Sequence, residues 1–245
     1  MRTICRGPSP QPVDFDDYAK AQPILLSRLG AYCSYCERRI PTSLAVEHIQ
    51  PKGLAAYAHL AGAWINFLLA CVNCNSTKKD KDVVLADVLL PDRDHTFAAF
   101  EYVKDGRVRP SPAVTAAGLE DMARRTLALT GLERRISEVF DQNGKLVAID
   151  RVSQRMEVWA IALEAKADVD ADPGNAAVKR GAVRTAKGYG FFSIWMAVFS
   201  GNVDMCNLLI EAFPGTRDSR CFDPVTATVV CPASNPDGLV DGAKF

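Results

Sequence analysis

Residues 31–82 read AYCSYCERRIPTSLAVEHIQPKGLAAYAHLAGAWINFLLACVNCNSTKKDKD, and this stretch decides the fold prediction. It contains two C-x-x-C pairs, Cys33-x-x-Cys36 and Cys71-x-x-Cys74. A C-x-x-C pair places two thiolates on one side of a tight turn, and two such pairs complete a tetrahedral Cys₄ zinc site. Because the protein fills all four positions, no position remains for water, and the predicted Zn²⁺ is structural.

The composition of the chain favours metal binding over disulfide formation at these cysteines. The 245 residues contain no apolar run long enough for a transmembrane helix, and MRTICRGPSPQP at the start lacks the apolar core of a signal peptide. We therefore expect a cytoplasmic protein without a membrane, in which thiols stay reduced. Chance spacing or a redox pair is the alternative interpretation.

The charge of the chain limits how it can bind nucleic acid. The formal net charge is zero, although phosphate binding is mostly electrostatic. Any basic surface must therefore be local. Basic residues do concentrate around the cysteine pairs, at Arg28, Arg38, Arg39, Lys52, Lys78, Lys79 and Lys81.

The segment SLAVEHIQPKG (43–53) lies between the cysteine pairs and predicts a short strand that ends at Pro51. Its adjacent Glu47 and His48 suit hydrolysis of phosphate esters. A carboxylate binds a hard cation such as Mg²⁺, and a neutral imidazole can take a proton from water. Alone the dipeptide is weak evidence, because such a pair is more often an exposed carboxylate beside a histidine whose hydrogen bonds are satisfied within the fold.

The second cysteine pair lies in WINFLLACVNCNSTKKDK (64–81), where the spacing predicts a helix from about Asn73. Asn75 would lie at the start of this helix, near the metal, as a neutral oxygen ligand. Lys78 and Lys79 follow one turn later and can reach phosphate oxygens. Lys52, which follows the predicted strand, is a third candidate for phosphate contact.

The string C-x-x-C … V-E-H-I-x-P-K … W-x-N-x-L-x-x-C-x-x-C-N-x-x-K resembles the HNH endonucleases over residues 30–82. The resemblance implies a ββα-metal finger, in which a β-hairpin and a helix hold one Mg²⁺ or Mn²⁺ ion. By position it implies that Glu47 and Asn75 are ligands of this catalytic metal and that His48 is the general base. Asn66 would brace the loop that orients the histidine. The implied reaction is phosphodiester hydrolysis by a water molecule that His48 activates.

A less specific resemblance extends beyond the finger. YCSYCE, EHIQPK, FPGT (213–216) and CFD (221–223) resemble the HNH effector nucleases of bacterial anti-phage systems, of the Septu and retron-associated types. That resemblance implies an ATPase partner, which the C-terminal region would dock. FPGT can also be a turn that ends a helix.

The rest of the chain predicts a hairpin and then helices. Residues 97–110 favour a hairpin whose turn is Asp105-Gly106. Helical periodicity follows at 119–129, 151–169, 176–199 and 202–213, before a tail of loops. We predict an α+β protein with a zinc-braced ββα-metal HNH finger embedded in a mainly helical chain. Residues 1–115 would form the nuclease domain, and 116–245 a helical domain that docks the partner.

Several polar residues receive a structural interpretation instead. His95 is expected to be exposed in a linker, and His59 to have a surface or core role. Basic residues of the helical region are expected to form a solvated face rather than to contact DNA. These residues are Arg134, Arg135, Arg151 and Arg155.

The sequence therefore predicts a metal-dependent endonuclease, most simply of double-stranded DNA, with two alternatives. One is a zinc-braced binding module without catalysis, for which a replaced Glu47, His48 or Asn75 would be the signature; all three are present. The other is a nuclease of RNA such as tRNA, since the finger contacts the backbone and not base edges. Sequence preference, trigger, oligomeric state and the choice between a nick and a double-strand break do not follow from the residues.

Overall fold

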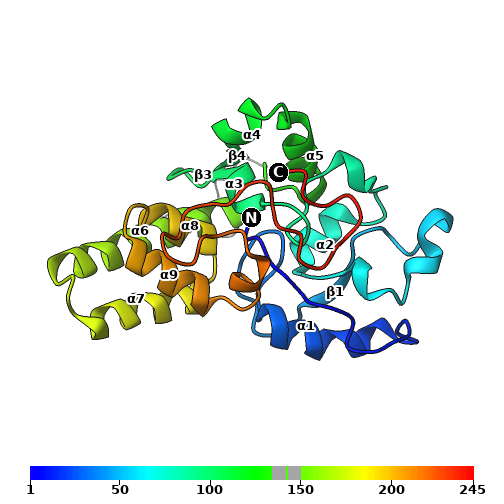
Figure 1. Cartoon of the computed structure of the whole chain (residues 1–245), viewed down its shortest axis with the longest axis horizontal. Coiled ribbons are helices and arrows are strands. Elements are labelled where there is room, and N and C mark those ends of the chain that lie inside the picture. The colour runs from blue at the N-terminus through cyan, green and yellow to red at the C-terminus, as the bar shows by residue number, and fades with distance from the viewer. Residues whose placement is uncertain (134–141, 143–149) are drawn as a thin grey trace.

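The structure is a computed structural model that describes residues 1–133, 142 and 150–245. The predicted α+β class is confirmed: helices predominate, and the described strands form two small antiparallel sheets of two strands each (Figure 1). In the described part of the chain, no helix is both long and apolar enough to cross a membrane.

The first sheet and the helix after it form the predicted finger. Strand β1 (Ala45–His48) pairs antiparallel with β2 (Phe67–Ala70), so that His48 lies opposite Phe67. Helix α2 (Val72–Lys78) begins directly after Cys71, whose backbone is extended. All four residues of β2 are buried, which anchors the hairpin in the core. The ββα order therefore agrees with the sequence prediction; α2 begins one residue before the expected start, and β1 ends three residues before Pro51.

A short helical segment precedes the finger. A 3₁₀ turn, η1 (Tyr18–Ala21), leads into α1 (Gln22–Leu29), which has a proline in its first turn, where a missing N–H costs nothing. Gly30 ends α1 with φ +75°, and a Cβ atom there would lie 2.7 Å from the Tyr32 ring. Glycine is required at this position for both reasons.

The predicted hairpin is present but shorter than expected. Strands β3 (Phe100–Tyr102) and β4 (Val108–Pro110) pair antiparallel, and Gly106 has positive φ in the turn. Residues Thr96–Ala99 form a helical turn, α3, instead of extending the first strand.

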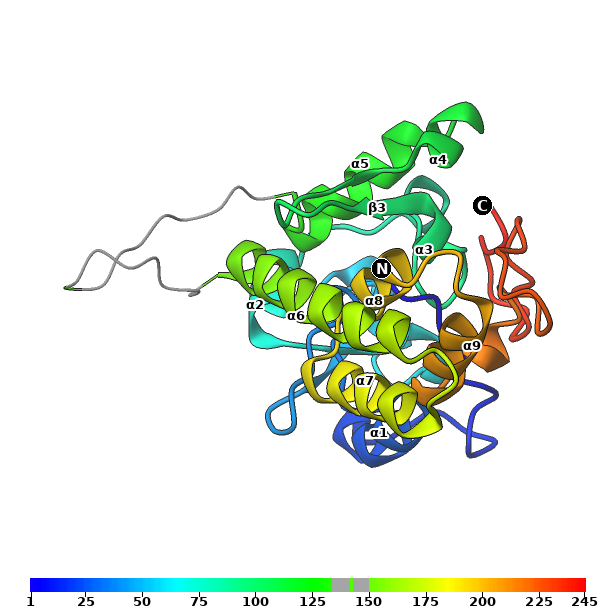
Figure 2. The same ribbon diagram turned by 90° about the vertical axis from the view of Figure 1, so that its left-hand side faces the viewer.

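The second half of the chain supplies the remaining helices. They are α4 (Pro112–Ala116), α5 (Glu120–Thr130), α6 (Arg151–Ala171), α7 (Ala176–Tyr189), α8 (Phe192–Val198) and α9 (Val203–Ala212). Figure 2 shows α6 between α5 above and α7 below, and α6 packs directly on α7 and α8. After α9 the tail contains only one 3₁₀ turn, Arg217–Ser219.

The prediction of a single helix over residues 176–199 is wrong. The chain breaks between α7 and α8 at Gly190 and Phe191, which have φ of +79° and +57°. Phe191 N donates to the backbone oxygen of Glu37, 2.9 Å away, and a Cβ atom on Gly190 would collide with the same oxygen. Contact with the first cysteine turn therefore overrides the local helical periodicity.

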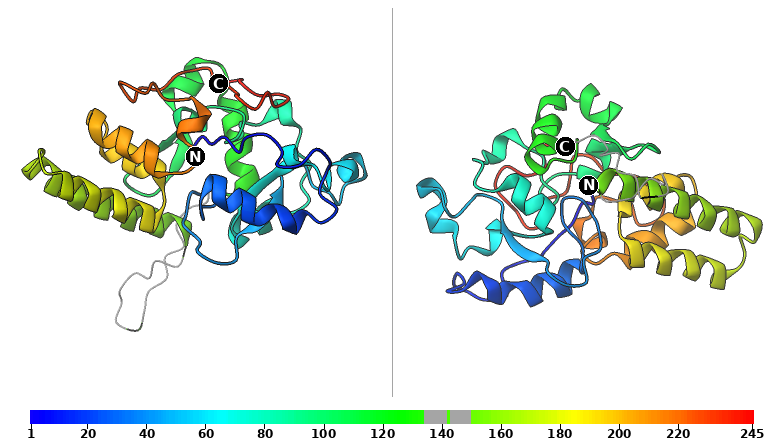
Figure 3. Two further views of the ribbon diagram at one scale, coloured as in Figure 1. Left: turned by 60° about the horizontal axis from the view of Figure 1, so that its bottom comes forward. Right: turned by 180° about the vertical axis from the view of Figure 1, so that it is seen from behind.

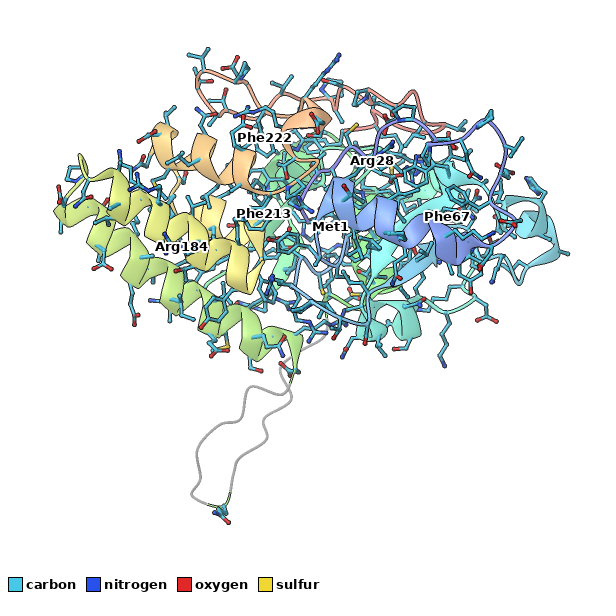
Figure 4. All side chains as sticks on the ribbon, turned by 90° about the horizontal axis from the view of Figure 1, so that it is seen from below. Met1, Arg28, Phe67, Arg184, Phe213 and Phe222 are labelled. Atoms are coloured by element: carbon cyan, nitrogen blue, oxygen red, sulfur yellow. The ribbon has the colours of Figure 1, made fainter. Side chains whose placement is uncertain are left out.

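One apolar core connects the finger with the helical region. The first residues of the chain cross the middle of the molecule (Figure 4), where the Arg2 guanidinium lies 5.6 Å from the centre of the Phe213 ring. The Arg2 guanidinium donates to Leu29 O at 2.8 Å and to Thr216 Oγ1 at 2.9 Å. The contacts thus cross the boundary expected between residues 115 and 116, and the division into two domains stays a prediction.

Burial overturns three of the structural interpretations. His95 is fully buried, because Thr3 Oγ1 and the Phe222 ring pack on its imidazole. Arg151 and Arg155 are buried rather than solvated, since their guanidinium groups donate to backbone carbonyls. His59 is exposed, as one of its two expected roles requires. Arg134 and Arg135 lie outside the described residues.

Candidate active site and zinc centre

The four cysteines of the two C-x-x-C pairs form one buried cluster. Their Sγ atoms all lie within 4.8 Å of one another, and Cys36 Sγ is 3.7 Å from Cys71 Sγ. A tetrahedral zinc site with Zn–S bonds of about 2.3 Å has sulfur atoms about 3.8 Å apart. The cluster therefore fits a structural Zn²⁺ ion.

The electrostatics of the cluster also favour a bound cation. Burial raises the pKa of the Cys33 thiol well above its usual value, and hydrogen bonding with Cys33 raises the pKa of Cys74 and lowers the pKa of Cys36 and Cys71. Holding all four groups as thiolates therefore needs positive charge nearby, which Zn²⁺ would supply. Arg151 brings further positive charge to the cluster, because its Nη1 donates to Cys74 Sγ at 3.0 Å. The same nitrogen also donates to Thr130 O at 2.9 Å. The sequence carries no signal for this contact, because Arg151 is 77 residues from Cys74.

A separate cleft of about 270 Å³ opens beside the finger. It brings together five of the residues predicted for the active site, namely Glu47, His48, Lys52, Asn75 and Lys79. Tyr18 and Asp80 also line it, although sequence reasoning did not single them out. Lys52 Nζ lies 3.7 Å from the centre of the Tyr18 ring, a cation–π contact that holds the lysine at the cleft.

The imidazole of His48 is held in one orientation. Its ring packs edge-on against Tyr18 and Phe67, with centroids 4.8 and 5.2 Å away. Nε2 lies 3.0 Å from Ala61 O, and because a carbonyl only accepts, Nε2 carries the proton. Nδ1 is then the acceptor nitrogen. Burial lowers the pKa of His48 below its usual value, so the neutral imidazole is favoured near pH 7.

Glu47 lines the same cleft as His48, although neighbours on a strand normally point to opposite faces. Its Oε2 accepts from the Tyr35 hydroxyl at 2.6 Å, and its Oε1 lies 2.7 Å from Lys78 Nζ. Burial raises the pKa of Tyr35, which keeps the hydroxyl protonated as a donor. Each carboxylate oxygen has two lone pairs, so these two contacts leave one acceptor position on each oxygen, although the side chain is only 1% exposed.

Lys78 does not lie where the phosphate-contact hypothesis puts it. Its side chain is only 1% exposed, and Nζ also donates to His48 O at 2.7 Å. Lys78 thereby ties the end of α2 to both candidate catalytic residues of β1. Lys79 and Lys52, in contrast, are exposed at the cleft.

Asn66 also lies outside the cleft lining. Its Oδ1 accepts from Gln50 N at 2.8 Å, and its Nδ2 donates to Gln50 O at 2.9 Å. This pair of hydrogen bonds closes the loop that follows β1 and fixes the exit of the strand beyond His48. Asn66 is therefore placed to position the loop and not to contact a ligand in the cleft.

The donor set at the cleft fits a hard divalent cation. Glu47 offers carboxylate oxygens, and Asn75, at the start of α2, offers an amide oxygen. Mg²⁺ and Mn²⁺ prefer such ligands and complete their coordination with water or substrate phosphate. Asp80 brings one further, exposed carboxylate to the rim.

Comparison with known proteins agrees with this arrangement for one part of the chain. No curated protein matches the chain. Residues 33–81, which contain both cysteine pairs, β1, β2 and α2, match the family described as HNH endonuclease, and this part of the chain is therefore similar to a nuclease domain.

Proposed function

We propose that this chain is a metal-dependent endonuclease that hydrolyses phosphodiester bonds of nucleic acid at the cleft. The observation that carries the proposal is the fixed orientation and the neutral form of the His48 imidazole. Its Nε2 is committed to the Ala61 carbonyl, and its pKa is lowered. A neutral imidazole with a fixed acceptor nitrogen is what a general base needs.

In the proposed reaction, His48 Nδ1 accepts a proton from a water molecule as the water oxygen attacks phosphorus. The P–O3′ bond then breaks, and the products carry a 5′-phosphate and, after proton uptake from solvent, a 3′-hydroxyl. Glu47 and Asn75 would hold the divalent cation, which when bound supplies Lewis-acid stabilisation of charge on the phosphoryl oxygens. Tyr35 and Lys78 fix the position of the Glu47 carboxylate, and Lys52 and Lys79 are free to contact phosphates.

We further propose that the substrate is double-stranded DNA, that Mg²⁺ or Mn²⁺ is the catalytic ion, and that residues 116–245 dock an ATPase partner in an anti-phage system. Support for the partner comes from the motif resemblance and from the zero net charge, because a neutral chain gains little from phosphate electrostatics. Nanomolar binding of duplex DNA by the purified chain at physiological salt would contradict partner dependence.

The test is a plasmid-cleavage assay on purified protein with Mg²⁺, with Mn²⁺ or with EDTA, after the zinc content has been measured. Wild type is expected to cut only with a divalent ion, and His48→Ala to lose about 10²- to 10⁴-fold of the rate. His59→Ala is the matched control, since His59 is exposed and does not line the cleft. If wild type cuts neither DNA nor RNA, even with a neighbouring ATPase added, a binding module without catalysis replaces this proposal.

A further inference from the structure

A second concave site lies where the end of α7 meets the end of α1 and the first cysteine turn. This pocket of about 380 Å³ is lined by Arg39, Arg184 and Lys187, together with Gly30 and Pro214. We call it the basic pocket, after its three cations. Figures 1 and 3 show α7 and α1 along the same side of the molecule, with their C-terminal ends next to each other.

The three cations of the basic pocket have no counter-charge among the described residues. All three side chains are exposed, and none takes part in a described ion pair. Lys179 on the same helix α7 pairs with Asp204 at 2.5 Å, and Lys166 on α6 pairs with Asp170, whereas Arg180 on α7 also forms no described ion pair. The segment 173–203 contains no acidic residue at all, so the positive charge of the basic pocket is locally uncompensated.

The candidate active site also carries two cations without a described ion pair. Lys52 and Lys79 line the cleft and form no described ion pair either. Two hollows of a chain with zero net charge thus carry exposed cations that form no described ion pair. Both hollows could bind anions that repeat along a polymer, such as the phosphates of a nucleic-acid backbone.

The distance between the hollows follows from the helix that joins them. Tyr18, at the start of η1, lines the cleft, and Gly30, just after α1, lines the basic pocket. Four residues of 3₁₀ helix and eight of α-helix rise by about 20 Å in total. Helix α1, with the sequence QPILLSRL, contains no acidic side chain that would repel a phosphate chain along this path.

We propose that the basic pocket binds a backbone phosphate of the nucleic-acid substrate at a distance from the bond that is cut. The inference rests on the proposed endonuclease function. At 3.4 Å per nucleotide along one strand, a separation of about 20 Å corresponds to about six nucleotides. The substrate is therefore a polynucleotide that extends at least this far on one side of the cleft, and not a short oligonucleotide.

The experiment measures binding of duplex DNA by fluorescence anisotropy as a function of salt, in His48→Ala protein so that the DNA stays intact. Arg184→Gln/Lys187→Gln is expected to raise Kd about tenfold and to lower the slope of log Kd against log salt by about 1, as the loss of one phosphate contact requires. Arg184 and Lys187 are both exposed, so their replacement does not disturb core packing.

The matched control is Lys104→Gln/Arg220→Asn, which removes the same charge from two exposed cations outside both hollows. Asparagine is chosen at 220 because that residue has φ +55°, which asparagine tolerates. Equal loss of affinity in the two double variants would show a general charge effect and overturn the proposal.

The length of the DNA provides a second test of the proposal. A hairpin whose stem is shorter than about six base pairs cannot reach both hollows, so the Arg184→Gln/Lys187→Gln variant should bind it as well as its parent does. The two proteins should diverge only on longer stems. An equal loss on both stems would contradict the proposed span.

Cleavage by protein with His48 intact separates this inference from the function on which it rests. If wild type cuts DNA and the basic-pocket variant keeps the same KM and kcat, the basic pocket has no role while the nuclease proposal stands. If the variant raises KM and leaves kcat unchanged, both proposals are supported. Failure of wild type to cut any nucleic acid overturns both.

Discussion

The zinc centre and the cleft lie on the same finger, but they are built in different ways. The cysteine cluster is buried, contains four soft ligands, and is contacted by Arg151 from the distant helix α6. The cleft is open, offers oxygen and nitrogen ligands, and takes all its lining residues from positions 18–80. The comparison indicates that the zinc centre joins the finger to the helical region, whereas the cleft is a local construction that can change without loss of the fold.

The largest effect should follow loss of zinc. Cys36→Ser removes one ligand, and structural zinc contributes on the order of 10 kcal/mol, as much as the whole stability of a typical domain. We expect unfolding of the finger and loss of the helical contacts with it, measured by circular dichroism and by zinc content. Cys231→Ser, at an exposed cysteine outside the cluster, is the control. A cooperative melt like that of wild type in zinc-free Cys36→Ser would contradict the structural role.

A smaller effect is expected at the cleft, from breaking the ion pair below it. Lys78→Met leaves the buried Glu47 carboxylate without its counter-charge, which should cost about 3 kcal/mol of unfolding free energy in EDTA. A divalent cation should recover part of this loss, because it brings positive charge to the same carboxylate.

Urea unfolding with and without Mg²⁺ measures the effect of Lys78→Met. The matched control is Lys79→Met, at the exposed neighbour, which should change stability by less than about 0.5 kcal/mol. If Mg²⁺ recovered as much stability in Glu47→Gln/Lys78→Met as in Lys78→Met, the ion would act at a site other than Glu47.

Acid should destabilise the protein through His95, which belongs to neither site. Burial lowers its pKa to about 4, so between pH 6.5 and 4 the unfolded chain binds a proton that the folded protein does not. This contribution to stability is complete above pH 6.5 and is lost as the pH falls towards 4, by up to about 3 kcal/mol.

Unfolding of wild type and His95→Gln across this pH range checks the His95 prediction, because glutamine keeps a polar contact for Thr3 but does not titrate. The variant should show a flatter dependence of stability on pH. Identical pH profiles for the two proteins would assign the acid sensitivity to other groups.

The smallest effect should be a change in zinc affinity without unfolding. Arg151→Met removes the guanidinium that donates to Cys74 Sγ, and outer contacts of this kind are typically worth about 10- to 100-fold in metal affinity. Competition with a chromogenic chelator measures it, with Arg124→Met as the control on the exposed side of α5. Unchanged zinc affinity in Arg151→Met would show that Arg151 contributes only through its hydrogen bonds to backbone carbonyls.

The sequence predicted what depends on short spacings. The clustering of the C-x-x-C pairs, the strand that carries Glu47 and the helix that follows Cys71 were all predicted, with the helix start correct to one residue and the strand end to three. The burial of Lys78 was missed, although a signal existed: it lies four residues after Cys74 and therefore on the same buried side of α2. Asn75 and Lys79, also four apart, share the side that faces the cleft.

Features that depend on distant contacts could not be predicted in this way. Arg151 at the zinc cluster, the break at Gly190 and the basic pocket each join segments more than 75 residues apart. Local periodicity gives no information about such pairs, since the same apolar pattern 176–199 is compatible with one helix or with two. The physical cause of the break, a backbone contact with Glu37, exists only in the folded molecule.

Glu37 has a further consequence for any attempt to transplant the finger into another protein. This residue follows the first cysteine pair with φ +64°, and its buried carboxylate accepts from Ser193 N at 2.8 Å, Ser193 Oγ at 2.5 Å and Tyr102 Oη at 3.3 Å. A fragment limited to residues 33–81 would expose this carboxylate to water and lose all three donors. The smallest portable unit therefore includes the β3–β4 hairpin and helix α8, which lie far outside the motif that marks the finger in the sequence.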